Sequence, residues 1–343
     1  MDKFPIVLIT LGDPAGSGPE LAMKTALNSS VKSTCIPVII GSPDIVSDAL
    51  KRIRKRPKLN LIDGKENLRS SQIFAENALQ VLPLSELKPN HFEKGVPSAT
   101  TGRNIVEISR TATKLARERA VDAICSAPAS KVSLRLAGYP YNGITDVFLE
   151  TLGLNKCGSM LVLGKIRLVL ATAHVPFASI PAILRPELIV ESVISLNEAL
   201  EDFFQITRPK IGIAALNPHA GEGGVYGTEE KDILYPAIDT LRLKGFTVSG
   251  PIPADFLIPK IKSGDLDGGV MLYHDQAHIP LKAVGLFEPA TLLLGLPIIR
   301  TSVAHGTVFG KAKSGTADPV GMINACVLAA KLAVRRQELQ WKQ

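Results

Sequence analysis

The chain has 343 residues, of which 45% are hydrophobic and 21% charged, so it is long enough to bury a large core. Its length predicts two domains or one large two-lobed unit. The formal net charge of +7 favours anionic ligands. The densest basic run, KRIRKRPK at 51–58, has no aromatic platform or nucleic-acid motif beside it. We therefore interpret this run as a solvated helix end and exclude nucleic acid as a partner.

The cysteines and the apolar runs indicate the compartment. The four cysteines are widely spaced and none stands in a CxxC pair, which is typical of reduced core residues in a cytosolic protein. No stretch resembles a signal peptide, and no apolar run reaches the roughly 18 residues that a membrane span requires. We therefore expect a soluble, cytoplasmic protein that does not contact a membrane.

In the first third of the chain, apolar runs alternate with helical patterns. The first strand is expected at residues 5–11, and it runs into the glycine-rich stretch GDPAGSGPE at 12–20. Pro19 suits the first turn of a helix. Backbone N–H groups at such a helix start can hold an anion, and a plain connection is the alternative. Further strands are expected at 36–40, 59–62 and 121–125, with helices at 44–54 and 100–120 and an irregular region at 63–98.

In the middle third, three expected strands each end at a histidine. The strands at 166–171, 211–216 and 268–273 are followed by His174, His219 and His274. Helices expected at 186–204 and 229–244 separate the strands, and this alternation predicts an α/β fold with a mostly parallel sheet. Because the carboxyl ends of parallel strands share one edge, the histidines could converge on a metal such as Zn²⁺ and leave positions open for substrate. For any one histidine alone, a loop or capping role is the alternative.

The last third contains a long glycine-rich loop. The stretch LLLGLPIIRTSV predicts a strand pair broken at 295–297, and AHGTVFGKAKSGTADP at 304–319 precedes a helix expected at 320–334. Loops longer than about 12 residues in a compact domain are usually functional. Small residues, backbone amides and two lysines suit a nucleotide or another phosphate-bearing ligand. A flexible surface loop is the alternative.

Seven stretches carry a resemblance to a known family. They are GDPAGSGPE, SAPASK, TAHVPF, NPHAGEGGVYGTEE, GPIPAD, YHDQAHIPLK and LGLPIIRTSVAHGT. In their order and spacing the chain resembles the PdxA family, the 4-hydroxythreonine-4-phosphate dehydrogenases, from end to end. That family is similar in fold to the isocitrate and isopropylmalate dehydrogenases, which are two-lobed α/β homodimers with mostly parallel sheets. The resemblance implies one lobe at 1–135 and 280–343, with the N-terminal and nucleotide loops, and a metal and dimerisation lobe at 136–279.

The resemblance also implies roles for individual residues. A divalent metal would be held by His174, His219 and His274, one of them reaching across the interface of a homodimer with a shared active site. Zn²⁺ is the metal expected, with Mg²⁺, Mn²⁺ or Co²⁺ as alternatives. Lys282 and Arg300 would hold the acidic groups of a small-molecule substrate, and Lys282 and Asp255 are the catalytic candidates. NAD or NADP would contact the loop residues His305, Gly306, Thr307, Gly315 and Asp318.

The resemblance implies oxidation of the secondary alcohol of a β-hydroxy acid. A divalent metal in the site would lower the pKa of the alcohol, and NAD(P)⁺ would accept the hydride. The product is a β-keto acid, and its decarboxylation follows because the enolate that develops is stabilised in the same site.

The chain departs from the family pattern at three positions that bear on the substrate. Ile144, which precedes Thr145 and Asp146, stands where the phosphate-ester enzymes have a histidine, Thr291 where they have an asparagine, and Ala304 where they have an aspartate. Each change removes a polar group, and a site built for a polar partner discriminates strongly when that partner is missing. With Ile144, Thr145 and Thr291 as substrate contacts, this favours an apolar ring over the phosphothreonine.

Three hypotheses about the activity follow. The first is a dehydrogenase of the terephthalate cis-dihydrodiol, 1,2-dihydroxycyclohexadiene-1,4-dicarboxylate, as in a second branch of the family that serves aromatic degradation. The alternative is 4-hydroxythreonine-4-phosphate dehydrogenase of pyridoxal phosphate biosynthesis, or a relative acting on another phosphorylated four-carbon acid. The SAPASK stretch with Lys131 is closer to the biosynthetic enzymes. The third is a chain that binds a ligand without catalysis.

Overall fold

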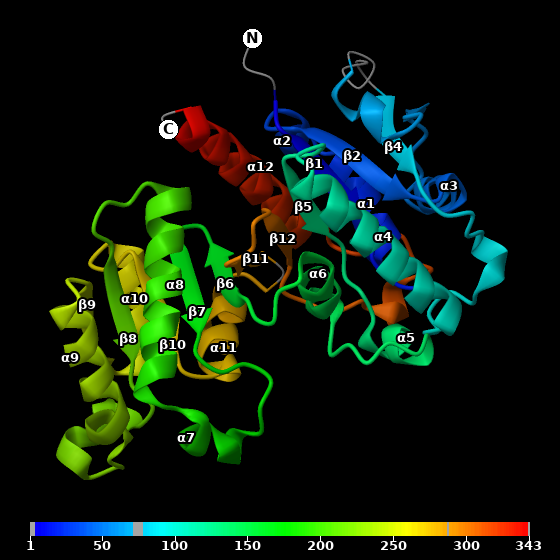
Figure 1. Ribbon diagram of the computed structural model, residues 1–343. Helices are drawn as coiled ribbons and strands as arrows, with labels where there is room; N and C mark the ends of the chain where they lie inside the picture. The colour runs from blue at the N-terminus through cyan, green and yellow to red at the C-terminus, as the bar shows by residue number, and fades with distance from the viewer. Residues whose placement is uncertain (1–3, 71–77, 287, 342–343) are drawn as a thin grey trace. The chain divides into compact units, whose positions relative to one another are not determined.

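The computed structural model describes residues 4–70, 78–286 and 288–341, which form two compact units (Figure 1). Unit 1 comprises Met1–Cys157 with Leu296–Gln343, and unit 2 comprises Gly158–Gly295. These boundaries differ from those expected from the sequence, at 135/136 and 279/280. The helix α6 (Ile144–Leu152) packs against α4 (Ala99–Arg117) and so belongs to unit 1. The helix α11 (His274–Val284) packs against strands of unit 2 and is not divided at 279/280.

Unit 1 contains a parallel sheet in the strand order β3-β4-β2-β1-β5-β12. The strands are β1 (Ile6–Thr10), β2 (Ile36–Gly41), β3 (Lys58–Leu61), β4 (Ala78–Pro83), β5 (Ala123–Ser126) and β12 (Arg300–Val303). The prediction of a mostly parallel sheet is confirmed. The expectation of an irregular region at 63–98 was wrong at β4. Gln80 interrupts the apolar pattern of β4, but it is buried and its Oε1 accepts a 2.6 Å hydrogen bond from Nδ2 of Asn60 on β3.

Helices cover both faces of the unit 1 sheet. α4 contacts β1, β2 and β5, whereas α12 contacts β1, β5 and β12 and also packs on α1. The helices are α1 (Gly18–Ala26), α2 (Ser29–Lys32), α3 (Pro43–Arg52), α4 (Ala99–Arg117), α5 (Lys131–Leu136), α6 and α12 (Val320–Trp341), with 3-10 turns η1 (Lys65–Arg69), η3 (Pro89–His91) and η7 (Phe309–Lys311). α5 and α6 were not predicted, because both are short and follow turn-rich sequence.

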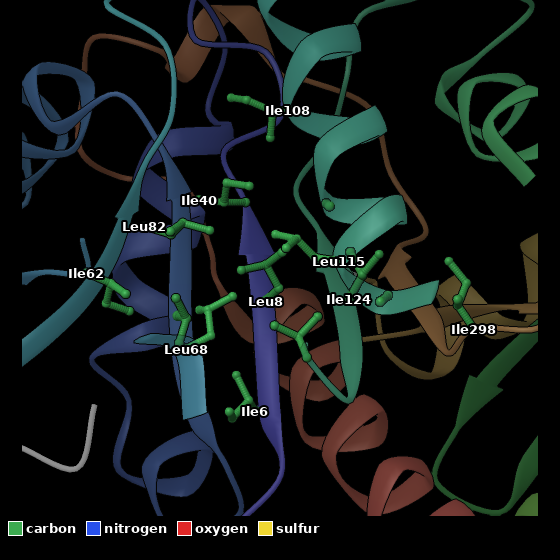
Figure 2. Close-up of a cluster of buried hydrophobic side chains, with 14 of the residues drawn as sticks. Ile6, Leu8, Ile40, Ile62, Leu68, Leu82, Ile108, Leu115, Ile124 and Ile298 are labelled. Atoms are coloured by element: carbon green, nitrogen blue, oxygen red, sulfur yellow. The ribbon is translucent and has the colours of Figure 1, made fainter. Parts of the chain in front are cut away.

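The core of unit 1 lies between its sheet and α4. Figure 2 shows Leu8 and Ile40 from the strands beside Ile108 and Leu115 from the helix. Every residue of β1 is buried, as expected for a parallel strand that helices cover on both faces. Each fully buried Leu or Ile side chain contributes about 1.5–3 kcal/mol relative to exposure. The continuous apolar run at 5–11 therefore folds as a central strand.

Unit 2 contains a mixed sheet in the strand order β11-β6-β7-β10-β8-β9. β7, β10, β8 and β9 are mutually parallel, whereas β6 pairs antiparallel with both β7 and β11. The strands are β6 (Gly158–Leu163), β7 (Ile166–Leu170), β8 (Lys210–Ala214), β9 (Thr247–Ile252), β10 (Gly268–Met271) and β11 (Ala290–Leu294). β6 was missed, because it returns directly into β7 through a tight turn at Gly164 rather than through a helix.

The helices of unit 2 also lie on its sheet. α8 packs on β6, β7 and β10, and α10 and α11 contact β7 and β10; Figure 1 shows α8 in front of these strands and α10 and α11 behind them. The helices are α7 (Ile180–Ile183), α8 (Pro186–Phe204), α9 (Tyr235–Leu243), α10 (Ala254–Ser263) and α11, with turns η4 (Phe177–Ser179) and η5 (Pro218–Gly224) and the π-helical turn η6 (Glu230–Leu234). Within the described ranges, no helix has the length and apolar character needed to cross a bilayer.

Candidate functional site

Three histidines of unit 2 lie at one edge of its sheet. β7 ends at Leu170, β8 at Ala214 and β10 at Met271, and His174, His219 and His274 follow these ends respectively. The three strands are parallel and adjacent in the order β7-β10-β8. The predicted placement of each histidine beyond the carboxyl end of a parallel strand is therefore confirmed.

Two of these imidazoles lie close together, and a third that was not predicted as a ligand joins them. The ring centroids of His174 and His274 are 5.7 Å apart, and the ring of His278 stacks on that of His274 at 4.0 Å. His274 Nδ1 lies 2.6 Å from a carboxylate oxygen of Asp275. Such a contact orients an imidazole and directs its Nε2 atom toward a metal. The four-residue spacing of His274 and His278 within one helix was the signal that sequence reasoning passed over.

The environment of His278 favours its neutral imidazole. Burial lowers the pKa of His278 to about 4, and the positive charges of His274, Lys282 and His174 act in the same direction, while Asp275 opposes them. Neutral imidazole is the form that coordinates a transition metal.

His219 lies apart from this cluster within the chain. It is an exposed residue of the turn η5, and its ring contacts that of Tyr226 at 6.2 Å between centroids. Across residues 4–70, 78–286 and 288–341, no group of three or more His, Cys, Asp or Glu side chains is arranged to hold a metal. One chain therefore brings together two of the three predicted ligands, and the complete set stays a prediction.

Hydrogen bonds between strand ends fix the positions of the histidine-bearing segments. The N–H and the hydroxyl of Thr172 both donate to the Leu272 carbonyl, at 3.1 and 2.7 Å, which joins the end of β7 to the end of β10. The Oε1 atom of Gln276 accepts from the N–H of Leu272 at 2.7 Å, and its Nε2 donates to the Ala215 carbonyl at 2.7 Å. Sequence reasoning missed Gln276, because its partners are only visible once β8 and β10 are neighbours.

The other predicted residues of unit 2 are placed as follows. Asp255 is an exposed residue in the first turn of α10, directly after β9, so it lies at the same edge of the sheet as the histidines. Lys282 is exposed in the last turn of α11. Thr291 is half-buried within β11, opposite Leu161 of β6. The roles predicted for them stay predictions.

Arg300 is a buried cation in unit 1. It is the first residue of β12, with a side chain 3% exposed. Its Nε donates to the Ser126 hydroxyl at 3.2 Å, and its guanidinium lies 5.0 Å from the Phe148 ring centroid. Burial lowers its pKa to about 10, against the opposing effect of the thiols of Cys125 and Cys157. The group therefore stays charged at neutral pH, and a buried cation of this kind is suited to an anionic ligand.

Ile144 begins α6 and packs against its own unit. Its side chain contacts the sheet core and a second apolar cluster formed by Ile105, Val106, Leu134, Tyr141 and Val147. The hollow that Ile144 lines with Thr10 and Gly12 is too small for a water molecule. Ile144 is half-buried, and these contacts give its apolar side chain partners within the protein, which weakens the argument that it exists to receive an apolar ring. Thr145, the next residue, is half-buried in the first turn of α6.

Two glycine-rich stretches of unit 1, recognised separately in the sequence, are in direct contact. The N–H and hydroxyl of Ser17 donate to the Thr307 carbonyl at 3.0 and 2.8 Å. A Cβ atom at Gly16 would lie 3.0 Å from the same oxygen, so glycine permits the close approach. Next to it, Asp13 is fully buried and accepts from the Ala15 N–H and the Ser133 hydroxyl at 2.9 and 2.6 Å. His305 and Gly306, which precede Thr307, follow β12 at the same end of the loop.

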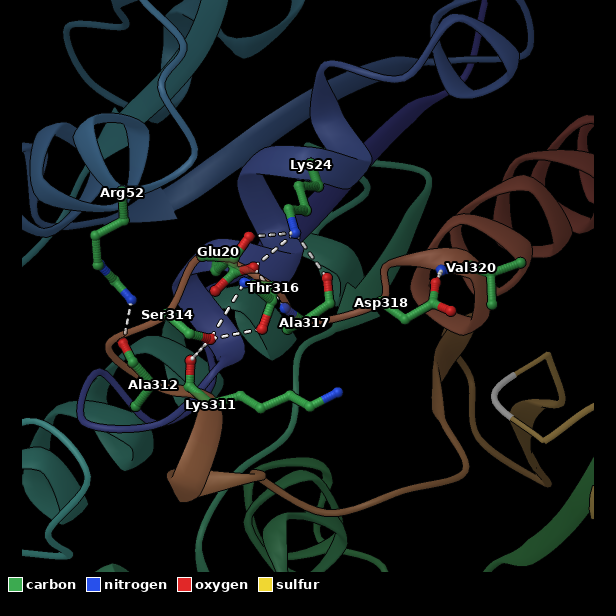
Figure 3. A network of polar contacts seen from close by, with 11 residues as sticks. Glu20, Lys24, Arg52, Lys311, Ala312, Ser314, Thr316, Ala317, Asp318 and Val320 are labelled. Atoms are coloured by element: carbon green, nitrogen blue, oxygen red, sulfur yellow. Dashed lines mark hydrogen bonds and ion pairs between the residues drawn. The ribbon is translucent and has the colours of Figure 1, made fainter.

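The second half of this loop is fastened to α1 and α3 (Figure 3). Lys24 Nζ donates to Glu20 Oε1, to the Gly315 carbonyl and to the Ala317 carbonyl at 2.6, 2.9 and 2.7 Å, and the Ala317 N–H donates to the same Glu20 oxygen at 2.8 Å. Asp318 caps α12, because its Oδ1 accepts from the Val320 N–H at 3.0 Å. These contacts favour an ordered loop over the alternative of a flexible surface loop. Glu20 and Lys24 were not predicted as site residues, although their four-residue spacing on a helix was a signal.

Comparison with known proteins identifies close relatives along the whole chain. The family model described as pyridoxal phosphate biosynthetic protein PdxA matches residues 33–329. A 4-hydroxythreonine-4-phosphate dehydrogenase of Desulforapulum autotrophicum is 34% identical over 96% of this chain and 96% of its own length. A D-threonate 4-phosphate dehydrogenase of Cupriavidus necator is 35% identical over 98% of this chain and 99% of its own length.

Solved structures give a matching result. The crystal structure of a 4-hydroxythreonine-4-phosphate dehydrogenase from Klebsiella pneumoniae superposes with a TM-score of 0.84 at 32% identity, covering 97% of this chain and 99% of the other. That of a terephthalate 1,2-cis-dihydrodiol dehydrogenase from Burkholderia xenovorans superposes with a TM-score of 0.62 at 29% identity, covering 95% and 98%.

Proposed function

This chain belongs to the PdxA family of dehydrogenases, and from that premise we propose that it oxidises the secondary alcohol of a phosphorylated four-carbon hydroxy acid, with loss of CO₂. The observation that carries the proposal is the pair of full-length relatives at 34% and 35% identity, whose names specify 4-hydroxythreonine 4-phosphate and D-threonate 4-phosphate. Both substrates are phosphorylated four-carbon acids with an oxidisable alcohol. NAD or NADP is the hydride acceptor in this proposal.

The hypothesis that the substrate is the terephthalate cis-dihydrodiol is not supported by these comparisons. The curated relatives act on phosphorylated acids by name, and the diol dehydrogenase superposes with the lower TM-score of the two solved structures. The sequence argument for the diol depended in part on Ile144, whose side chain packs against apolar clusters of unit 1. The phosphorylated-acid alternative is therefore the one proposed.

The imidazole cluster of unit 2 supports a divalent metal. His174 and His274 would hold it, and their proximity, the Asp275 contact of His274 and the neutral form of the neighbouring His278 all fit a transition metal. When bound, the metal would polarise the substrate alcohol and lower its pKa. Zn²⁺ is proposed, with Mg²⁺, Mn²⁺ and Co²⁺ as the alternatives to be compared.

A homodimer would complete the metal site with His219 from a second copy. Exposed apolar side chains stand near the histidines along the chain, which is typical of a surface that another protein covers. Phe177 and Ile279 are 73% and 65% exposed in the segments that follow His174 and His274, and Val225 is 71% exposed close to His219. A substrate bound there would be shared between two chains.

Arg300 is proposed to bind an acidic group of the substrate. It is charged and buried, and within the described part of the chain its side chain contacts the Ser126 hydroxyl and the Phe148 ring and no carboxylate. An anionic group would supply the missing charge-assisted hydrogen bonds. Lys282 and Asp255 are retained as the proposed proton-transfer and substrate-orienting residues, because each is an exposed ionisable group in a helix that follows a strand of unit 2.

A turnover assay tests the proposal. The purified chain, supplied with Zn²⁺ or Mg²⁺ and with NAD⁺ or NADP⁺, is mixed in turn with 4-hydroxythreonine 4-phosphate, D-threonate 4-phosphate and the terephthalate cis-dihydrodiol. Reduced cofactor is followed by its absorbance and CO₂ release is measured in parallel. We expect one of the phosphorylated acids to have the highest kcat/KM. A higher kcat/KM for the diol would overturn the proposal.

A further inference from the structure

The segment that carries His219 has an unusual backbone. His219, Ala220, Gly221, Glu222 and Gly223 all have positive φ angles, of 54°, 56°, 76°, 41° and 68°. A residue other than glycine in the left-handed region costs about 1–2 kcal/mol, and such a conformation persists only when its surroundings enforce it. Some group outside the turn must therefore hold it.

The carboxylate of Glu230 lies against this turn. Its side chain is 3% exposed, in the π-helical turn η6. Its Oε1 accepts from the N–H groups of Leu216 and Asn217 at 2.9 and 2.7 Å, and its Oε2 accepts from Asn217 Nδ2 at 2.9 Å. Hydrogen bonds to an ionised acceptor contribute roughly twice as much as neutral ones. The carboxylate thus fixes the residues that lead from β8 into the turn.

The turn itself closes against the same carboxylate. The N–H of Tyr226 donates to the Gly221 carbonyl at 3.2 Å. A Cβ atom at Gly221 would lie 2.7 Å from Glu230 Oε2, so the backbone passes directly over this oxygen. Within the described residues, no lysine or arginine forms an ion pair with Glu230. Its side chain accepts hydrogen bonds there from Leu216 and Asn217, the residues that lead into the turn. The buried carboxylate therefore stabilises the backbone at the turn and does not form a salt bridge with a described residue.

We propose that Glu230 is a positioning residue, which holds His219 in the conformation that binds the divalent metal. This inference rests on the proposed function, since it takes His219 as a metal ligand. Residues that orient a metal ligand typically change metal affinity by about 10–100-fold when they are replaced. Glu230 acts through the backbone of Leu216 and Asn217, and it does not itself contact the metal.

The test uses Glu230→Gln in the full chain. The glutamine amide keeps an oxygen that accepts from the two backbone N–H groups. Its NH₂ group, however, faces Asn217 Nδ2, and two donors cannot form a hydrogen bond. Rotating the Asn217 amide would let its oxygen accept from the new donor, but it would also place that oxygen against Glu229 Oε2, which accepts from Nδ2 at 2.7 Å. Asp232→Asn is the matched control, an exposed carboxylate in the same turn η6. Thermal unfolding shows whether Glu230→Gln folds. If it does not, Asn217→Ala is the second variant, because it removes the Asn217 Nδ2 donor to Glu230 Oε2.

Metal binding is measured with Co²⁺, by calorimetry and by the visible absorption that reports its ligand geometry. We expect Glu230→Gln to weaken Co²⁺ binding by about 10–100-fold and to change the absorption, while Asp232→Asn matches the parent chain. In a double variant with His219→Ala, Glu230→Gln should cause no further loss, because both changes remove the same interaction.

The outcomes separate the inference from the proposed function. Normal Co²⁺ binding by Glu230→Gln, with weakened binding by His219→Ala, overturns the role of Glu230 and leaves the ligand assignment standing. Full additivity in the double variant also overturns it, because Glu230 would then act independently of His219. Normal Co²⁺ binding by His219→Ala removes His219 from the ligand set, and it overturns both the ligand assignment and the role of Glu230.

Discussion

The Gln276 side-chain amide donates to the Ala215 carbonyl at 2.7 Å and so joins the strand end that precedes His274 to the one that precedes His219. Replacing it with Glu keeps the acceptor for the Leu272 N–H but places a carboxylate oxygen against the Ala215 carbonyl. We expect a loss of about 1–3 kcal/mol in the free energy of unfolding, because the buried carbonyl loses its donor. Urea unfolding of both proteins measures the change.

Gln276→Met serves as the comparison, because it removes both hydrogen bonds without adding a charge. If Glu destabilises the chain more than Met, although Glu keeps the hydrogen bond from Leu272, the carboxylate beside the Ala215 carbonyl adds a repulsive cost of its own. A Glu variant as stable as the parent chain would show that the link to Ala215 contributes nothing.

Lys24 fastens the loop at 312–317 to α1, and its removal should loosen that loop. Lys24→Met leaves the buried Glu20 carboxylate without its cation and frees two backbone carbonyls. We expect a lower Tm and a Kd for NAD⁺ or NADP⁺ raised roughly ten-fold, because ordering a free loop opposes binding. Calorimetric titration with the cofactor measures this. Lys32→Met, which removes an exposed lysine from α2, should leave the cofactor Kd unchanged; an unchanged Kd in Lys24→Met as well would exclude the loop as a cofactor site.

The pH dependence of stability has a predictable contribution from Asp13. Burial raises the pKa of this carboxyl above its ordinary 3.8, against the hydrogen bonds from Ser133, Ala15 and Thr101. The folded chain therefore binds this proton more tightly than the unfolded chain does. The stability that the group contributes is fully present below pH 3.8 and is lost as the pH rises through the raised value.

Asp13→Asn isolates that contribution, because the amide is uncharged at every pH. We expect the variant to gain stability relative to the parent chain as the pH rises from about 4 to 7, as measured by urea unfolding at each pH. A stability difference that does not vary with pH would contradict the raised pKa.

Most of the strands and the placement of the histidines could be predicted from the sequence, because both depend on local pattern. Continuous apolar runs such as 166–171 become buried parallel strands, and a polar residue just beyond a run falls at the sheet edge. Other features could not be predicted, because they depend on partners that are distant in the chain. Gln80 is compatible with β4 only because Asn60 faces it, and Glu230 is informative only once the turn that it holds is seen. Ile144 suggested an apolar substrate, whereas its neighbours in the fold are the core of unit 1.

Arg300 should show opposite effects on stability and on activity. Arg300→Met removes a buried charge for which the described residues supply no counter-charge, so we expect a higher Tm. The same change removes the proposed contact to an acidic group of the substrate, so kcat/KM should fall by at least about 100-fold. Scanning calorimetry and steady-state assays with the phosphorylated acid measure the two effects on one preparation.

Arg167 supplies the matched control in unit 2. Its guanidinium is partly buried and, like that of Arg300, lies against an aromatic ring, 4.2 Å from the Phe204 ring centroid; it donates to the Asp267 carbonyl. Arg167→Met should lower the Tm, because that carbonyl loses its donor, and should leave kcat/KM near that of the parent chain. If Arg300→Met instead destabilises the chain and retains its kcat/KM, Arg300 is a structural residue and the anion-binding role is wrong.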